Sequence, residues 1–583
     1  MILQALTEYY QALEREGKIA APGWSPVKVT FALCIGDDGS LEQVIDIQTE
    51  QVRGKKAVLA PQTVSLPAPV KRSSGVAANF LCDNSSYILG IDTKGKPQRT
   101  LECFAACKEL HETLLKNVDS SAAQAVLAFF RTWDPEKARE NPILAECLED
   151  VLAGGNLIFR TENGYVHEDP AVQRAWEAHY NSAGDGPQGI CLVTGENGPI
   201  ENIHPSIKNV VGAQSSGAAL VSFNAPAFCS YGKEQNLNAP TGKFASFAYT
   251  TALNHLLADR ERVFRIGDTS VVCWARNAKP AYAVLFGGAF FGSPVSYTEN
   301  DLRGMVKSLC SGQPVIYNED KLDPNMDFYV LGLSPNAARL SVRFFLHNTF
   351  GGFLRNVQAH YNRLEIVRPV YDKFETLPLW KLLSETVNQN ARDKSPAPDL
   401  AGEVLRAVLM NTRYPATLLN GVTLRIRAER EVTRGRAAIL KAYYLKNQHP
   451  DVPKEVLSVS LNESSGNIPY ELGRLFSVLE AIQAAANPGI NSTIKDKYFN
   501  SAAATPAVIF PILINLAQKH LKKLRGTNAG LAIFYEKQMT ELCGRLGKSY
   551  PTRMNLSQQG SFQLGYYHQT QARYQKKEEK EHV

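Results

Sequence analysis

The chain has 583 residues, of which 44% are hydrophobic and 21% charged, and its formal net charge is +6. A single core stops growing at about 250 to 300 residues, so the length predicts two or three domains. The longest apolar run, residues 281–292, contains glycines and is shorter than the roughly 18 residues of a membrane span. These values exclude a membrane protein and a disordered one, and no membrane partner is expected.

The start of the chain indicates where the protein is located, and the spacing of its cysteines indicates whether it binds a metal. The first 17 residues place Ile2, Leu6 and Leu13 at helical spacing and carry acids early, unlike a secretory signal. The ten cysteines stand singly except Cys103 and Cys107, and no CxxC pair or zinc-type His pair occurs. We therefore expect a cytoplasmic protein with free thiols, no metal and no cofactor.

The first 390 residues predict mixed structure. Strand-like runs cover 27–34, 44–47 and 87–91, a helical pattern covers 102–156, and 271–274 reads as a buried strand. The polar segment 388–399 holds two prolines and is the best candidate for a linker. The fold class expected is α+β, with a mixed region over 1–390 followed by an all-α C-terminal part.

Helical signals dominate after that segment. Leu472, Leu475, Phe476, Leu479 and Ile482 recur at steps of three and four, and Asn487-Pro488-Gly489 ends the helix. A second helix begins at Thr505-Pro506, a third covers about 530–546 and a fourth about 561–579. We therefore expect a basic helical connection over 391–458 and a four-helix bundle over 459–583.

Charge is distributed unevenly. Residues 401–450 hold nine Lys/Arg against three Asp/Glu, and residues 459–583 hold fifteen against nine. With residues 451–458 at −1, the part after 400 carries +11 and the part before it carries −5. A basic C-terminal third suggests a surface that faces nucleic acid, although solvated helix faces rich in lysine give the same pattern.

Catalytic motifs were weighed and mostly rejected. The run 90–97 fits GxxxxGK, but Pro97 stands where Ser or Thr must hold magnesium. The turn around Ser215 and Ser216 is similar to serine-hydrolase turns, yet it lacks the G-x-S-x-G elbow. His204, His255 and Asp259 could serve as partners of such a serine. A serine-dependent amidase or hydrolase stays as the alternative to a binding protein.

One long stretch, residues 194–254, carries little charge and many amides and hydroxyls. This stretch and four further segments resemble the large subunit of the type I-C CRISPR interference complex, the Csd family. The further segments are Met1-Ile2-Leu3-Gln4-Ala5-Leu6, Leu331-Gly332-Leu333-Ser334-Pro335-Asn336-Ala337-Ala338-Arg339, Leu472-Gly473-Arg474-Leu475-Phe476 and Ala486-Asn487-Pro488-Gly489-Ile490-Asn491. The resemblance covers essentially the whole chain.

The resemblance implies a non-catalytic subunit of an RNA-guided ribonucleoprotein (Cascade) complex used in antiviral defence. Such a subunit recognises the protospacer-adjacent motif (PAM) in duplex DNA, stabilises the R-loop and its displaced strand, and helps to recruit a helicase-nuclease. Its implied partners are CRISPR guide RNA, target double-stranded DNA, and backbone, handle-binding and small subunits. Base pairing with the guide RNA recognises the long target sequence. The protein therefore needs only contacts to the short motif and a basic channel. A pure scaffold subunit remains a further alternative.

Three sets of residues are predicted to bind nucleic acid. A loop after the proline-rich stretch 61–70 offers cations, hydroxyls and amides at Lys71, Arg72, Ser73, Ser74, Asn79 and Asn84. The low-charge block offers neutral donors and acceptors at Gln214, Ser215, Ser216 and Asn224. The C-terminal helices offer a basic face at Lys495, Lys497, Lys519, Lys522, Lys523 and Arg525. For the segment 331–336, which leads to Arg339 and Arg343, contact with RNA or a subunit and a structural strand-to-helix turn are both open.

Val459 is a candidate start of a second, shorter polypeptide. The resemblance implies that a separate small subunit is made by internal translation of the same gene, and Val459-Ser460-Leu461-Asn462-Glu463 lies where that subunit would begin. A bacterial GUG codon can initiate there, although Val459 as an ordinary linker residue explains the same sequence. Residues 459–583 are long enough to form an independent domain.

Overall fold

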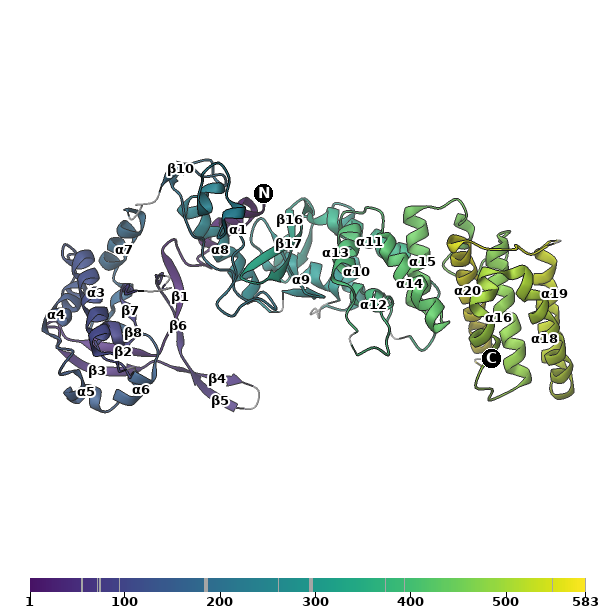
Figure 1. Cartoon of the computed structure of the whole chain (residues 1–583), viewed down its shortest axis with the longest axis horizontal. Helices are drawn as coiled ribbons and strands as arrows, with labels where there is room; N and C mark the ends of the chain where they lie inside the picture. The colour runs from purple at the N-terminus through teal and green to yellow at the C-terminus, as the bar shows by residue number, and fades with distance from the viewer. Residues whose placement is uncertain are drawn as a thin grey trace. The chain divides into compact units, whose positions relative to one another are not determined.

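The computed structural model describes residues 1–53, 56–70, 72, 75–93, 95–182, 187–260, 262–292, 297–372, 374–392, 394–547 and 549–581. The chain forms two compact units. The first unit comprises Met1, residues 3–205 and residues 221–252, and the second comprises Ile2, residues 206–220 and residues 253–583. Both units contain helices and strands, and the strands pair mostly antiparallel (Figure 1), so the expected α+β class is confirmed.

A mixed sheet lies at the centre of the first unit. β2 (Phe31–Ile35) pairs antiparallel with β3 (Leu41–Asp46) and parallel with β8 (Leu157–Thr161), so that Leu33 stands opposite both Val44 and Phe159. β7 (Cys82–Asp83) and β9 (Gly164–Tyr165) also pair with β8. The strands expected at 27–34 and 44–47 are confirmed, although the first is split between β1 (Trp24–Val29) and β2.

The strand expected at 87–91 is wrong. These residues belong to α2 (Ser85–Ile88) and the turn after it, because Asn84 caps the helix by accepting a hydrogen bond from the backbone N–H of Ser86. Tyr87, Ile88 and Leu89 are all buried. A short apolar run that is buried on every side has no periodicity, so helix and strand cannot be distinguished in it.

Helices and small hairpins complete the first unit. Phe129 and Phe130 from α4 (Ser121–Thr132) pack on Phe159 of β8, with ring centroids 5.3 and 5.8 Å away. The remaining helices are α1 (Ile2–Arg15), α3 (Pro97–Leu115), α5 (Pro142–Ala145), α6 (Leu148–Ala153), α7 (Pro170–Ser182) and α8 (Lys243–Ala258), which continues into the second unit. The remaining hairpins and ribbons pair β1 with β6 (Gln62–Pro67), β4 (Thr49–Arg53) with β5 (Lys56–Ala60), and β10 (Gln188–Ile190) with β11 (Asn197–Pro199).

The second unit contains a four-stranded antiparallel sheet in the order β12 (Phe264–Ile266), β13 (Thr269–Ala275), β16 (Asp327–Asn336), β17 (Arg339–Thr349). Every residue of β13 is buried, which confirms the buried strand expected at 271–274. Residues 331–339 form a hairpin in which Asn336 pairs with Arg339, so a strand-to-helix turn there is wrong. Ala337 supplies the positive φ of 53° that this two-residue turn needs.

One continuous core runs through the second unit from Phe264 to Tyr567. The expected linker at 388–399 lies inside this unit, because α13 (Pro398–Leu409) packs on β17 and on α11 (Phe350–Leu364). The other elements before residue 450 are α9 (Pro280–Phe286), the π-helix η5 (Gly287–Phe291), α10 (Glu299–Cys310), β14 (Val315–Tyr317), β15 (Asp320–Leu322), α12 (Leu379–Ser384), α14 (Ala416–Glu429) and α15 (Arg434–Asn447).

The described residues after 459 form five helices where the sequence predicted four. α16 (Ile468–Ala486), α18 (Pro506–Thr527), α19 (Ala529–Arg545) and α20 (Leu556–Glu581) correspond to the expected helices and lie side by side (Figure 1). α17 (Ile494–Ala504) was missed because it is short and buries only Ile494, Phe499, Ala502 and Ala503. The sequence feature that marks the start of α17 is a capping box, in which the side chains of Thr493 and Asp496 accept hydrogen bonds from each other's backbone N–H groups.

Two glycines let α16 and α20 cross closely. A Cβ added at Gly473 would overlap the carbonyl oxygen of Phe562, and one added at Gly565 would overlap that of Tyr470. Only residues without a side chain permit this approach of two backbones. The Leu475, Phe476 and Leu479 side chains beside the crossing are buried, as their spacing predicted.

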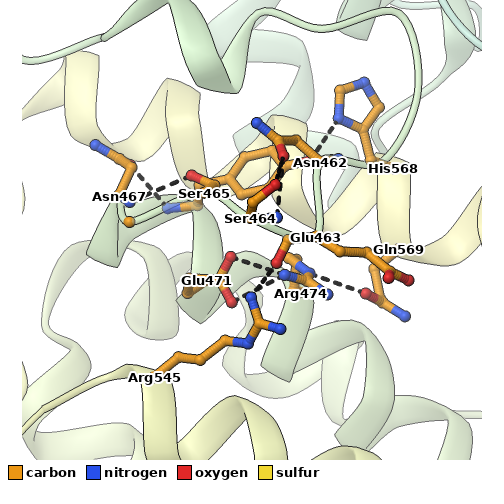
Figure 2. Close-up of polar contacts among 12 residues, drawn as sticks. Asn462, Glu463, Ser464, Ser465, Asn467, Glu471, Arg474, Arg545, His568 and Gln569 are labelled. Carbon is orange, nitrogen blue, oxygen red and sulfur yellow. Dashed lines mark hydrogen bonds and ion pairs between the residues drawn. The ribbon is translucent and has the colours of Figure 1, made fainter.

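Polar contacts join α16 to α20 and join the segment before α16 to α19 (Figure 2). Arg474 donates to both carboxylate oxygens of Glu471, at 2.8 and 3.0 Å, and to Oε1 of Gln569 at 3.0 Å. Arg545 donates to the carbonyl oxygen of Glu463. The segment between Val459 and α16 is thus bound by α19 and also by Glu455, whose carboxylate accepts from Ser465 Oγ and Gly466 N–H at 3.1 Å.

None of the helices of the described ranges is long and apolar enough to cross a membrane.

We predict that Gly473→Ala loosens the crossing of α16 and α20. The added methyl group meets backbone that cannot rotate away, so a loss of about 1–3 kcal/mol in local stability is expected. Unfolding of a chain with several units is not two-state, so the readout is hydrogen–deuterium exchange of peptides from α16 and α20. Gly526→Ala in α18 is the control, since a Cβ there meets nothing within 4 Å. Equal protection in both variants would contradict the close crossing.

Candidate nucleic-acid interface

Arg72, predicted as a phosphate contact, is part of a structural cluster. Its guanidinium forms a bidentate ion pair with the buried carboxylate of Asp83 and donates to the carbonyl oxygen of Ala77 at 2.6 Å. It also lies over the ring of Tyr87, 4.0 Å from the centroid. Removal of one partner of a buried pair is strongly destabilising, so substitution of Arg72 would report on folding before it reports on DNA.

Asn79 and Asn84 also build this loop. The side-chain oxygen of Asn79 accepts from the backbone N–H of Val70 at 2.9 Å, and Asn84 caps α2. Lys71, Ser73 and Ser74 lie outside the described residues. The described members of this predicted set thus have intramolecular partners, and their contact with nucleic acid stays a prediction.

Gln214, Ser215 and Ser216 lie exposed on a tight turn of the second unit. The turn closes by a hydrogen bond of 2.9 Å from Gly217 N–H to Gln214 O. Ile207 and Ala218 exchange two backbone hydrogen bonds, of 2.9 and 2.8 Å, which close the base of the loop. Gly217 has a φ of +96° and a Cβ there would press on Ser206 and Ile207, so the turn requires glycine.

Further backbone contacts fix this loop at one end of the four-stranded sheet. Ala219 N–H donates to Ala338 O at 3.0 Å, and Leu340 N–H donates to Ala219 O at 2.9 Å. Val211 N–H donates to Ser270 Oγ at 3.3 Å. The antiparallel strand order brings the turns 267–268 and 337–338 to the same end. We call the loop 206–220 together with these two turns the sheet end.

The sheet end also carries cations that the sequence did not single out. Lys208 is exposed, and so is Arg265, which lies next to the turn 267–268 and donates from its Nε to Gly267 O at 3.1 Å. Arg343, by contrast, is engaged by Ser334 Oγ at 2.7 Å and Asp268 at 3.1 Å. Neutral donors and acceptors on a rigid turn, beside exposed cations, suit a phosphate backbone and the base edges next to it. No local sequence pattern marks Lys208 or Arg265.

Asn224 is exposed, but it belongs to the first unit. The low-charge block of residues 194–254 is therefore divided between the two units. The sheet end unites Gln214, Ser215 and Ser216 with the segment 331–339, two features that the sequence presented separately.

The basic C-terminal set occupies α17 and α18. Lys497, Lys519 and Lys522 are exposed, and Lys495 is half-buried. Lys523 donates to Asn487 Oδ1 at 2.7 Å, and Arg525 forms an ion pair with Glu536. Residues 494–545 hold eight Lys/Arg against three Asp/Glu, and two of these acids, Glu536 and Glu541, have arginine partners. This leaves a net positive helical surface.

Two of the residues considered as partners of a hydrolase serine, His204 and Asp259, have side-chain partners of their own. His204 is buried and its Nδ1 lies 2.7 Å from the hydroxyl of Tyr249, and burial lowers its pKa to about 4. Asp259 pairs with Arg262. Ser215 and Ser216 lie on an exposed turn. The described ranges contain no group of three or more His, Cys, Asp or Glu able to hold a metal ion.

Comparison with known families identifies the family of the chain. Residues 6–574 match the family model described as CRISPR-associated protein (Cas_Csd1). The curated proteins include no match to the chain. Since the family match spans nearly all of the sequence, the chain belongs to the Csd1 family of CRISPR-associated proteins.

Proposed function

We propose that this protein is the large subunit of a type I-C Cascade complex, that it recognises the protospacer-adjacent motif in duplex DNA, and that it has no catalytic role. The observation that carries the proposal is the sheet end, where Gln214, Ser215 and Ser216 stand exposed on a turn fixed by backbone hydrogen bonds. A turn with little freedom loses little entropy when it binds, so weak neutral contacts suffice. Lys208 and Arg265 supply attraction to phosphates.

The minor groove is the surface that such a turn fits best. The pattern of donors and acceptors there is degenerate, so a short motif needs few side chains. No helix has to enter a major groove in this scheme. The guide RNA reads the rest of the target by base pairing, and the protein holds the duplex where opening begins.

The basic surface of α17 and α18 is assigned to the displaced strand. Single strands are held by basic grooves that follow the backbone without reading sequence. Lys497, Lys519 and Lys522 extend into solvent there, whereas Lys523 and Arg525 are partly committed to Asn487 and Glu536. Guide RNA, the backbone, handle-binding and small subunits, and the helicase-nuclease complete the proposed set of partners.

The C-terminal part is also proposed to occur as a separate small subunit that starts at Val459. Five helices of residues 468–581 pack on one another, and the Arg545–Glu463 contact binds the segment before α16 to α19. In the full chain, this part is held by Val367, whose N–H donates to Val459 O at 2.7 Å and whose carbonyl accepts from Tyr567 at 2.7 Å.

We predict that the sheet end separates affinity from motif preference. Gln214→Ala and Ser215→Ala should change the ranking of duplexes that differ in the motif, since one base-edge contact is worth about 1–3 kcal/mol. Lys208→Ala should weaken all duplexes alike and reduce the salt slope by about one. Binding of the assembled complex is measured between 50 and 200 mM salt.

Lys307→Ala, an exposed lysine of the same unit, is the matched control for Lys208. If the Gln214 and Ser215 variants keep the affinity and motif ranking of the unmodified complex, the sheet end does not read DNA. A chain that binds no duplex in any form, even within the complex, would instead be a scaffold.

The triple variant Lys497→Ala, Lys519→Ala and Lys522→Ala should shorten the lifetime of the R-loop. Three lost phosphate contacts weaken the hold on the opened strand, while the initial capture of the motif involves other residues. The dissociation rate of the triple variant is measured on full-length target DNA and on shortened target DNA. The control is a second triple variant with the exposed cations Lys116, Arg131 and Lys307 replaced by alanine. An equal loss in capture and lifetime, or no loss in either, would refute the assignment.

Expression of the native gene with its upstream sequence should yield a second polypeptide that begins at position 459. Intact-mass spectrometry of the purified complex identifies it, with methionine as the first residue if the codon is GUG. Replacement of codon 459 by an alanine codon should remove this product and leave the full chain. Only full-length chain from the native gene would contradict internal initiation.

A further inference from the structure

Four aromatic side chains are exposed on and beside the segment 366–381 of the second unit. Their exposed fractions are 85% for Tyr371, 56% for Trp380, 51% for Tyr574 of α20 and 38% for Phe374. The rings of Phe374 and Trp380 meet edge to face, with centroids 5.8 Å apart. The pKa of Tyr371 is raised chiefly by partial burial, and the Tyr574 hydroxyl is among the nearby groups that raise it further. Large apolar groups that gather on a surface mark interaction sites. We call the segment 366–381 together with Tyr574 the aromatic surface.

Arg434 of α15 fixes the loop that precedes α12. Its guanidinium forms an ion pair with Asp372 at 3.1 Å and donates to the carbonyl oxygens of Phe374 and, at 2.8 Å, Glu375. Both side chains of the ion pair are mostly buried. The exposed ring of Tyr371 therefore extends from an anchored backbone, and an anchored backbone loses little entropy when a ligand binds.

Cations lie against two of the four rings. Lys381 Nζ is 5.1 Å from the ring centroid of Phe374, and the guanidinium of Arg573 is 5.1 Å from that of Tyr574. Arg368 is exposed in the same segment. The cores of protein interfaces are depleted of charged residues, and of lysine in particular. Aromatic rings with cations beside them are instead the composition that binds the bases and phosphates of single strands.

The acids of this region do not cancel the cations. The segment 366–381 contains two acids, and both are paired with arginine: Asp372 with Arg434, and Glu375 with Arg303. A third acid, Glu431, is exposed near Tyr371. Among these described residues, five cations stand against three acids, since the two paired arginines are joined by Arg368, Lys381 and Arg573. The balance of +2 attracts a phosphate backbone.

We propose that the aromatic surface binds unpaired bases of the displaced DNA strand, which stack on Tyr371 and Trp380 while the neighbouring cations hold the phosphates. Base pairing occupies the bases of the guide RNA and of the target strand, so the displaced strand is the one whose bases are free in the R-loop. Every base has a π-face, so stacking tolerates any sequence. The proposal rests on the proposed role in the R-loop, and it adds base contacts to the phosphate contacts of α17 and α18.

The test is the R-loop lifetime of the assembled complex that carries Tyr371→Ala and Trp380→Ala together. One stacked base is worth roughly five- to 150-fold in affinity, so dissociation should be at least about fivefold faster. The salt slope should not change, because no phosphate contact is removed. The pair Tyr371→Phe and Trp380→Phe keeps both rings and should retain the lifetime within about threefold. Tyr231→Ala, which removes a 98%-exposed ring of the first unit, is the control and should change the lifetime less than about twofold.

A photo-crosslink identifies the ligand. 5-Iododeoxyuridine is placed along the displaced strand and 4-thiouridine along the guide RNA in separate samples of the assembled complex. Irradiation should join the displaced strand to peptides that contain Tyr371 or Trp380, identified by mass spectrometry. A crosslink of these peptides to the guide RNA instead, or to neither strand, overturns the proposal.

The lifetime measurement also separates this proposal from the proposed function. A complex that captures the motif but forms no R-loop would refute the role of the chain in strand opening, and base stacking with it. A complex that forms R-loops whose lifetime is the same in the alanine pair and in the unmodified chain overturns base stacking alone.

Discussion

The contact between Ala219 and the turn of the β16–β17 hairpin is the constraint on which the proposed DNA-reading site depends. Two backbone hydrogen bonds, from Ala219 N–H to Ala338 O and from Leu340 N–H to Ala219 O, join the loop 206–220 to a hairpin that is distant in sequence. Backbone bonds are insensitive to side-chain identity, so the exposed Gln214, Ser215 and Ser216 are free for other contacts. A loop with the same residues and no such anchor would have to be ordered when it binds.

The two proposed nucleic-acid surfaces differ in the kind of interaction that they offer. The sheet end offers few charges and fixed neutral groups, a combination that favours discrimination over strength. The surface of α17 and α18 offers lysines on helices, which favour strength without discrimination. The close crossing at Gly473 and Gly565 supports the second surface, because it fixes α16 and α20 as the platform on which the outer helices pack. The aromatic surface adds a third kind of interaction, the stacking of unpaired bases on exposed rings.

Much of the local structure could be predicted from the residues. The recurrence of Leu472, Leu475 and Phe476 marked α16, and Thr505-Pro506 marked the start of α18. Apolar periodicity decides such elements because one face must leave water. Prediction failed at α2, where Ser85, Tyr87 and Ile88 are all buried, and at α17, where the buried face is short. It also failed for the hairpin at 336–339, since nothing local showed that β17 would follow the turn.

The sequence by itself determined the family, the α+β class, the amphipathic helices and the basic C-terminal third, because these follow from composition, order and short-range period. Tertiary structure decided which polar groups remain available. The guanidinium of Arg72 is paired with the carboxylate of Asp83, eleven residues away. Lys208 becomes a candidate phosphate contact because the loop 206–220 is bound to the end of the sheet. It also decided that the chain divides around residues 205–253 and not near 390. Such outcomes depend on pairings between distant segments, and a residue's partner across space leaves no mark in its own neighbourhood of the chain.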